Sequence, residues 1–149
     1  MATSRDIDDL RPHVAEKCRA HLAACAAEGI DLLITCTLRD WDEQDRLYRQ
    51  GRTAPGARVT NAQAGDSAHN YGLAYDVVPL RNGKPVWGTI ATMDAELWER
   101  VGELGEAQGL EWSGRWRKFK EYAHFQDMGG QTLAELKAAY IQAGGSAIA

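Results

Sequence analysis

The stretch Ser67–Asp76 reads SAHNYGLAYD, and it places a histidine and an aspartate on either side of a glycine. His69 and Asp76 are seven residues apart, and positions separated by an odd number point to opposite faces of a continuous strand. The chain must therefore bend between them if both are to reach one site. Gly72 provides the bend, because glycine adopts backbone angles that are closed to other residues. We therefore expect His69 on a loop and Asp76 on a strand.

Imidazole and carboxylate groups in this stretch have the chemistry of zinc ligands. Catalytic zinc binds three protein groups and keeps a fourth position for water. A second histidine, His124, lies downstream near the acidic residue Glu121. His69, Asp76 and His124 would complete a metal site for Zn²⁺ with hydrolytic chemistry. The alternative is a core strand beside a loop histidine that has an ordinary hydrogen-bond partner.

Sequence signals on both sides of this stretch indicate several strands. Apolar, β-branched and aromatic runs predict them at Ile30–Thr37, Val59-Thr60 and Leu73–Val78, the second lying inside a long loop, Thr53–Ala68. Pro79 should end the last of these strands. The Asn-Gly turn within Arg81–Pro85 then predicts a hairpin, with Val86-Trp87 as the returning strand.

Capping residues and apolar spacing predict four helices. They span about Asp8–Glu28, Asp40–Gln50, Asp94–Gln108 and a last helix that begins at the Thr132 cap. Pro12 would lie in the first turn of the first helix, whose apolar stripe contains Val14, Cys18 and Cys25. We therefore expect an α+β fold in which helices pack on one side of a small, mainly antiparallel sheet.

Length and composition indicate a compact globular chain of one domain, residues 1–149, with no separate second domain. No apolar run approaches the roughly 18 residues of a membrane span, so we expect no stable membrane association. The first residues are polar and acidic, and they do not resemble an export signal. A net charge of −4 argues against a protein that binds nucleic acid through its phosphates.

The three cysteines, Cys18, Cys25 and Cys36, are expected to be reduced packing residues. Cys18 and Cys25 would lie two turns apart on one helix, roughly 10 Å by helical rise, which is too far for a disulfide. A rival metal site could combine His21 with Cys25, although both positions also fit the buried face of an amphipathic helix.

The pattern Ser-x-His-x-x-Gly-x-Ala-x-Asp resembles the zinc peptidases that include D-alanyl-D-alanine carboxypeptidases and the L-alanyl-D-glutamate endopeptidases of phage endolysins. Further similar blocks read TLR at 37–39, GLEWSGRW at 109–116 and EYAHFQ at 121–126. The resemblance implies a hedgehog/D-Ala-D-Ala-peptidase-like fold, a Zn²⁺ cofactor and the peptidoglycan stem peptide as substrate.

The resemblance also implies that Glu121 is the catalytic acid and base. It would accept the proton of the attacking water and deliver it to the leaving amine. A regular strand would place Glu121 and His124 on opposite faces, so we expect a turn or an irregular segment between them. In a straight strand, Glu111 would become the next candidate.

Arg39 would stabilise the oxyanion, because a fixed guanidinium donates several hydrogen bonds and is always charged. The alternative for Arg39 is a surface salt bridge with Asp40 or Asp42. Gln44 would orient Arg39 or bind substrate. Ser67 would bind substrate, or would hold the loop that presents His69.

The basic and aromatic run Arg115–Lys120 has three interpretations. It could be a solvated loop, it could line a cleft for an anionic wall polymer, or it could stack on nucleic-acid bases.

The resemblance favours an L-alanyl-D-glutamate endopeptidase of the phage type. Such an enzyme would be a monomer that acts in host lysis and stays in the host cytoplasm until it is released to the periplasm or cell wall. The alternatives are a D,D- or L,D-carboxypeptidase that removes terminal D-alanine during wall remodelling, and a non-catalytic module that binds wall peptides or a partner protein.

Overall fold

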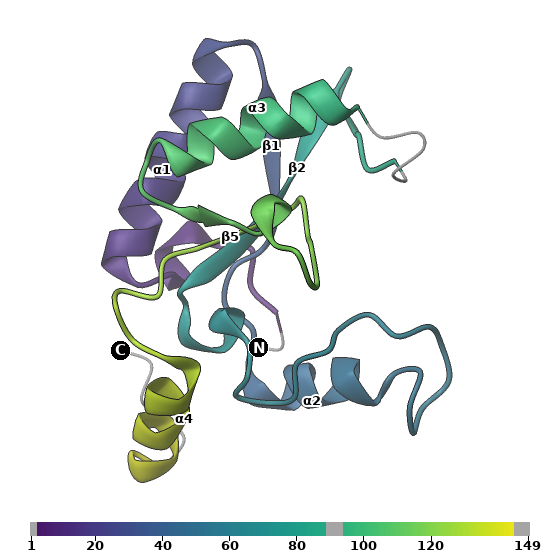
Figure 1. Ribbon diagram of the computed structural model, residues 1–149, viewed down its shortest axis with the longest axis vertical. Helices are drawn as coiled ribbons and strands as arrows, with labels where there is room; N and C mark the ends of the chain where they lie inside the picture. The colour runs from purple at the N-terminus through teal and green to yellow at the C-terminus, as the bar shows by residue number, and fades with distance from the viewer. Residues whose placement is uncertain (1–2, 89–93, 145–149) are drawn as a thin grey trace.

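An antiparallel sheet of five strands forms the centre of the molecule in the computed structural model, which describes residues 3–88 and 94–144 (Figure 1). The strands are β1 (Asp31–Cys36), β2 (Ala74–Arg81), β3 (Lys84–Pro85), β4 (Glu111–Trp112) and β5 (His124–Gln126). They lie in the order β1-β2-β5-β4, and β3 pairs with the end of β2. Each of these pairs is antiparallel, as the sequence predicted.

The described residues form four α-helices, which are α1 (Pro12–Ala27), α2 (Trp41–Arg49), α3 (Ala95–Glu106) and α4 (Leu133–Gln142). Figure 1 shows α1 and α3 beside the sheet, with α2 and α4 toward the other end of the molecule. Trp41 of α2 stacks on Tyr140 of α4, with ring centroids 4.1 Å apart. The predicted α+β class is confirmed. None of the helices in the described ranges is long and apolar enough to cross a membrane.

The first helix begins later than the sequence pattern indicated. The Asp6 side chain accepts a hydrogen bond from the Asp8 backbone N–H and starts a separate 3₁₀ turn, Ile7–Asp9. The α-helix then begins at Pro12, because proline has no N–H to satisfy and its fixed φ suits the first helical position. The predicted start at Asp8 is therefore wrong, whereas the placement of Pro12 in the first turn is confirmed.

Strand β2 continues through Pro79, where the sequence predicted its end. The Pro79 carbonyl accepts a hydrogen bond from the Val86 N–H at 2.9 Å, so the strand keeps an acceptor at a residue that lacks a donor. The turn at Asn82 and Gly83, with φ of 53° and 76°, closes the predicted hairpin. Its returning strand is Lys84–Pro85 and not Val86-Trp87.

The predicted short strand at Val59-Thr60 does not form. This pair lies in an irregular segment that follows α2, and the Thr60 side chain accepts a hydrogen bond from the Ala62 N–H at 3.1 Å. Hydroxyl groups that bond to nearby backbone compete with strand pairing, so the β-branched residues here mark a loop.

One extra residue interrupts the pairing of β1 with β2. Ile34 pairs with Val77, but the next paired residue of β1 is Cys36, which faces Asp76. Thr35 has no counterpart on β2, which is the arrangement of a β-bulge. Because Asp76 also faces His124 on β5, strands β1, β2 and β5 meet near the start of β2.

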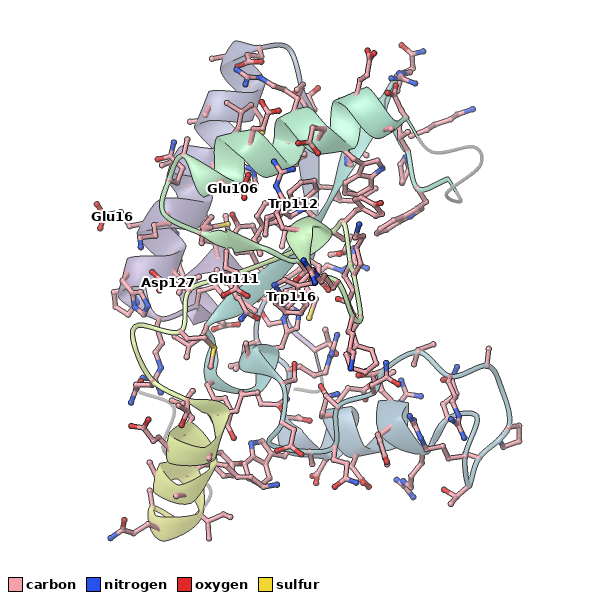
Figure 2. All side chains as sticks on the ribbon, in the orientation of Figure 1. Glu16, Glu106, Glu111, Trp112, Trp116 and Asp127 are labelled. Atoms are coloured by element: carbon pink, nitrogen blue, oxygen red, sulfur yellow. The ribbon has the colours of Figure 1, made fainter. Side chains whose placement is uncertain are left out.

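Helix α3 packs very closely on β4 and β5 through two glycines. A Cβ atom added to Gly102 would lie 2.3 Å from the Trp112 ring, and one added to Gly105 would lie 2.5 Å from Phe125. Trp112, labelled in Figure 2, is buried and donates its indole N–H to the Tyr122 carbonyl at 2.8 Å. This contact fixes the segment that leads into β5.

The three cysteines are buried and free, as expected. Burial raises the pKa of Cys18 to about 12 and that of Cys25 to about 11, so both thiols stay protonated. His21 is also a core residue, because its two ring nitrogens bond to the Tyr75 hydroxyl at 2.6 Å and the Val101 carbonyl at 2.8 Å. The rival metal site at His21 and Cys25 is therefore not formed.

Candidate metal centre

The short 3₁₀ helix Ala68–Tyr71 carries His69 to the sheet. The Ser67 side chain caps this helix by accepting a hydrogen bond from the His69 N–H at 3.3 Å. Gly72 ends it in the left-handed conformation, with φ of 68°, which glycine adopts without steric cost. The bend predicted between His69 and Asp76 is present, and Asp76 lies on β2 as expected.

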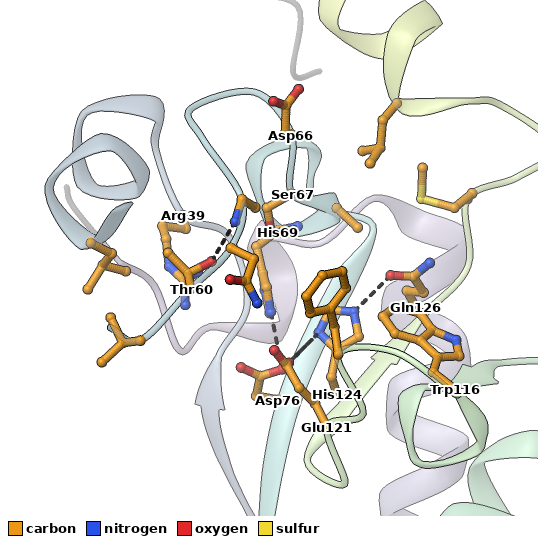
Figure 3. A pocket seen from close by; sticks show the side chains of 18 residues that line it. Arg39, Thr60, Asp66, Ser67, His69, Asp76, Trp116, Glu121, His124 and Gln126 are labelled. Carbon is orange, nitrogen blue, oxygen red and sulfur yellow. Dashed lines mark hydrogen bonds and ion pairs between the residues drawn. The ribbon is translucent and has the colours of Figure 1, made fainter. Parts of the chain in front are cut away.

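The side chains of His69, Asp76 and His124 converge on one point. The Nε2 atom of His69 and the Nδ1 atom of His124 each lie 3.1 Å from the same Asp76 oxygen, Oδ1. Figure 3 shows the three groups pointing toward one another, His69 from the short 3₁₀ helix, Asp76 from β2 and His124 from β5. Both histidines are nearly buried. The spacing in sequence therefore becomes a compact set of two imidazoles and one carboxylate.

The second ring nitrogen of each histidine forms a hydrogen bond on the side of the ring away from Asp76. The Nδ1 atom of His69 bonds to the Thr37 carbonyl at 2.8 Å, and the Nε2 atom of His124 bonds to the Gln126 side-chain oxygen at 2.8 Å. Each outer nitrogen donates its N–H to one of these acceptors, which directs Nε2 of His69 and Nδ1 of His124 toward Asp76, where each can bind a metal ion in place of a proton. The donor set and its supports fit a zinc ion.

The charges at this point favour a cation. Burial would raise the pKa of Asp76, but the adjacent histidines hold it well below its usual range. For His69, burial lowers the pKa, but the Asp76 charge and hydrogen bond, with a smaller contribution from Cys36, outweigh it and raise the pKa to about 10. A metal ion that binds here would take the place of the proton on the imidazole.

Cys36 lies behind His69, at the bulge of β1. Its sulfur is 3.5 Å from Nδ1 of His69, the nitrogen that also bonds to the Thr37 carbonyl. Sγ of Cys36, one donor atom of His69 and one of Asp76 all lie within 4.8 Å of one another. Because Cys36 approaches the back of the imidazole, we place it as a support and not as a ligand.

Glu121 lies just before the turn Tyr122-Ala123 that leads into β5, so the segment between Glu121 and His124 is irregular, as predicted. Its Oε2 atom is 3.9 Å from Nδ1 of His124, and its side chain is 58% exposed. Carboxylate oxygens of Asp76 and Glu121 and a ring nitrogen of His124 lie within 4.8 Å of one another. The irregular segment thus brings Glu121 to the same side as the candidate ligands.

Glu111, the next candidate, occupies a different position. Its carboxylate accepts a hydrogen bond from the Trp116 indole at 2.8 Å and one from the Gln126 amide at 3.5 Å. Glu111 and Trp116 are labelled in Figure 2. Glu111 therefore stands behind Gln126, whereas Glu121 lines the cleft beside the candidate ligands.

Arg39 lines the cleft beside the candidate ligands, and two neighbours hold its guanidinium. Nη1 donates to the Gln44 side-chain oxygen at 3.1 Å, and Nη2 donates to the Cys36 sulfur at 3.4 Å. Arg39 forms no ion pair with Asp40 or Asp42 in the described structure, because the Asp40 carboxylate caps α2 by accepting from the Glu43 N–H. Nε of Arg39 is buried and has no hydrogen-bond partner among the described residues.

The structure gives different surroundings to the two expected substrate-binding residues. Gln44 is fully buried, and it bonds to Arg39, the Ala62 carbonyl and Asn70. This geometry favours the orientation of Arg39 over direct contact with substrate. Ser67 both lines the cleft and caps the helix that carries His69, so its geometry is compatible with both proposed roles.

A cleft of about 570 Å³ opens over the candidate metal site. Its polar part contains His69, Asp76, Glu121 and His124, and its apolar wall is lined by Leu47, Val59, Trp116, Phe119, Met128 and Leu133. The size and the mixed lining are typical of a site for a small peptide.

The basic and aromatic run divides between two surroundings. Arg115 turns to α3, where it pairs with Glu99 at 2.6 Å and with Glu106 at 3.0 Å. Trp116 and Phe119 line the cleft, while Arg117 and Lys118 are exposed. The run is therefore part cleft wall and part solvated loop.

Sequence reasoning missed Gln126, Thr37 and Cys36 as supports of the site. Gln126 was detectable, because it lies two residues after His124 on a predicted site segment and alternate residues of a strand share a face. The Thr37 carbonyl and the Cys36 sulfur were not detectable, because their positions depend on the bulge in β1.

Comparisons with known proteins found related peptidases. A family model described as D-alanyl-D-alanine carboxypeptidase matches residues 60–127, the segment that contains the candidate ligands and Glu121. The peptidoglycan L-alanyl-D-glutamate endopeptidase CwlK of Bacillus subtilis (strain 168) is 41% identical over 128 residues, which are 79% of this chain and 73% of CwlK.

Two solved structures share the fold. The L-Ala D-Glu endopeptidase ChiX of Serratia marcescens matches with a TM-score of 0.61 and 20% identity, over 83% of this chain and 86% of ChiX. The D,D-pentapeptidase VanY of a VanB-type vancomycin resistance cassette, solved with Zn(II), matches with a TM-score of 0.57 and 15% identity, over 87% of this chain and 78% of VanY.

Proposed function

The chain belongs to the D-alanyl-D-alanine carboxypeptidase family of peptidases, and we propose that it is a zinc-dependent endopeptidase that cuts the L-alanyl-D-glutamate bond of peptidoglycan stem peptides. The observation that carries this proposal is the convergence of His69, Asp76 and His124 beside Glu121 at the wall of a cleft. The identity to CwlK, which is named for that bond, supports the choice of substrate.

The residues of the cleft have separate roles in the hydrolysis. When bound by His69, Asp76 and His124, Zn²⁺ supplies a Lewis acid and a water molecule that loses its proton near neutral pH. Glu121 accepts that proton on its carboxylate and then donates it to the nitrogen of the leaving amine. The oxygen of the deprotonated water forms a bond to the carbonyl carbon, and the peptide bond between this carbon and the leaving nitrogen breaks as the nitrogen gains the proton.

Arg39 acts on the oxygen of the scissile carbonyl. As the carbon becomes tetrahedral, negative charge develops on this oxygen, and a fixed guanidinium stabilises it by hydrogen bonds and charge. The contacts with Gln44 and Cys36 hold Arg39 before substrate arrives, so little reorganisation accompanies the reaction.

The test combines metal analysis with digestion of purified muropeptides by wild type and Glu121→Gln. We expect one zinc per chain in both proteins and a fall in kcat of about 10²- to 10⁴-fold in the variant. Unchanged cleavage by Glu121→Gln would contradict the mechanism. Mass spectrometry should find fragments that end in L-alanine and begin with D-glutamate.

The same experiment separates the other candidate functions. Release of free D-alanine alone would identify a D,D- or L,D-carboxypeptidase. Binding of muropeptides without cleavage under any metal condition would identify a non-catalytic module.

We further propose that the enzyme acts as a monomeric phage-type endolysin in host lysis, held in the host cytoplasm until release to the wall. The support is the resemblance of the blocks around His69 and His124 to the phage branch of the family. Expression in a bacterial host, with and without a membrane-permeabilising protein, tests this role. Lysis should require the permeabilising protein, and lysis without it would contradict the proposal.

A further inference from the structure

A second, smaller cleft continues from the candidate metal site past Glu121. Its volume is about 200 Å³, and its lining consists of Arg58, Val59, Thr60, Asn61, Phe119, Lys120 and Glu121. Five of these residues, Val59, Thr60, Asn61, Phe119 and Glu121, also line the larger cleft. The two cavities therefore meet along the same wall, and one extended ligand can occupy both.

Two cations distinguish the smaller cleft. Arg58 and Lys120 are exposed, and neither forms an ion pair in the described part of the chain. Arg58 makes one long hydrogen bond, to the Gly51 carbonyl at 3.4 Å, and Lys120 lies 5.9 Å from the Tyr122 ring centroid. By contrast, Arg115, which lines neither cleft, is paired with two glutamates.

We propose that this smaller cleft is a subsite in which Arg58 and Lys120 bind a free carboxylate on the residue at the leaving side of the scissile bond. The inference rests on the proposed function. Glu121 donates its proton to the leaving nitrogen, so the residue that carries this nitrogen lies next to Glu121. That residue's remaining groups can therefore reach the smaller cleft, which Glu121 also borders.

The chemistry of the leaving residue fits this cleft. A glutamyl residue has two carboxyl groups, and when one is in peptide linkage the other can remain free as an anion. A carboxylate between a guanidinium and an ammonium group gains charge-assisted hydrogen bonds that an amide of the same shape does not make. The subsite thus selects the free acid over the amide.

Phe119 marks the boundary between the two clefts. Its backbone has φ of 56°, in the left-handed region that is costly for a bulky residue, and its side chain is 66% exposed. Backbone strain of this kind is kept where the surrounding structure requires it. With Val59, Phe119 supplies an apolar wall for the aliphatic part of the same residue.

The test uses two synthetic stem peptides that differ only in this group, one with a free carboxylate and one with a carboxamide on the leaving residue. The variants are Lys120→Gln and Arg58→Gln. Lys118→Gln is the matched control, because it removes the same charge from the same exposed segment but does not line the smaller cleft.

Wild type should have a lower KM for the acid peptide. Each subsite variant should raise that KM by about 5-fold, the value of one exposed charge contact of about 1 kcal/mol, with kcat and the amide KM unchanged. Equal KM values for acid and amide in wild type, or the same loss in Lys118→Gln, would overturn the subsite and leave the proposed function intact.

Calorimetry with the Glu121→Gln protein separates the two proposals, because binding needs no turnover. If the acid peptide binds more tightly than the amide peptide, and if Lys120→Gln removes this difference in affinity, the subsite is supported even if the enzyme does not cleave the L-alanyl-D-glutamate bond. Equal binding of acid and amide overturns it. A third peptide that ends in D-alanine distinguishes the source of the carboxylate. If the enzyme cleaves only this third peptide, and if that cleavage depends on Lys120, the subsite is supported but the endopeptidase assignment is overturned.

Discussion

At the scale of single residues, the site depends on groups that stand behind the candidate ligands. Gln126 accepts a hydrogen bond from the outer nitrogen of His124, and its amide N–H donates to Glu111. A chain of hydrogen bonds therefore runs from Glu111 through Gln126 to the candidate ligand His124. Thr37 does the same for His69 through its backbone carbonyl. Such partners fix the orientation of an imidazole and increase its basicity.

Replacement of Gln126 by leucine should weaken zinc binding. The change removes the acceptor for the N–H of His124 and frees the ring to rotate, and losses of about 10- to 100-fold in metal affinity are typical of such partners. Competition with a chromophoric chelator measures the affinity. Gln63→Leu, at an exposed position outside the site, is the control, and equal affinities of the two variants would refute the role of Gln126.

At the scale of elements, the sequence was most informative where structure is local. The caps Asp40 and Thr132 were identified correctly, because each is a contact within a few residues. The end of β2 was not, because whether a strand stops at Pro79 depends on its neighbours in the sheet. The strand predicted at Val59-Thr60 does not form for a similar reason, because a strand needs a neighbouring strand to pair with. The Thr60 hydroxyl bonds to the Ala62 N–H instead.

The contact of α3 with β4 gives a prediction at this scale. Gly102→Ala should destabilise the protein by about 1–3 kcal/mol, because the new methyl group would lie 2.3 Å from the Trp112 ring and force it to move. Urea unfolding measures the effect. Glu96→Ala, at an exposed position of the same helix, should change stability by no more than about 0.5 kcal/mol. An equally stable Gly102→Ala protein would show that the helix can shift away from the sheet.

At the scale of the whole molecule, Asp127 joins the end of β5 to α1. Its carboxylate accepts from Lys17 at 2.5 Å and from the Gly129 N–H at 3.0 Å. Burial would raise the pKa of Asp127, but these hydrogen bonds outweigh it and lower the pKa from its usual 3.8. The stabilisation that the Asp127 carboxylate contributes is therefore present above its usual pKa of 3.8, and it is lost as the pH falls through the lower pKa of the folded state.

Asp127→Asn should cost about 1 kcal/mol at neutral pH, and its difference from wild type should shrink in acid. Unfolding curves at pH 7 and in steps below pH 4 measure this dependence. Asp45→Asn is the control, because the Asp45–Arg49 pair is more than half exposed on both sides. A constant difference at all pH values would show that charge on Asp127 is not the cause.

The sequence predicted the α+β class and the candidate ligands, because the glycine bend between His69 and Asp76 is a local signal and the motif around His124 resembles that of the family. It offered Gln44 as a residue that orients Arg39, but it could not predict that Cys36 holds the guanidinium together with Gln44. That arrangement needs the register of β1 against β2 and the fold of α2 beside it, which are properties of the whole chain.

The bulge at Thr35 has a consequence for how related sequences can differ. Thr35 has no partner on β2, so the identity of its side chain is weakly constrained, while the presence of a residue there is required. Deleting it would move Cys36 and Thr37 by one position and turn their side chains and carbonyls to the opposite face. Family members should therefore vary freely in residue type at this point and hardly at all in length.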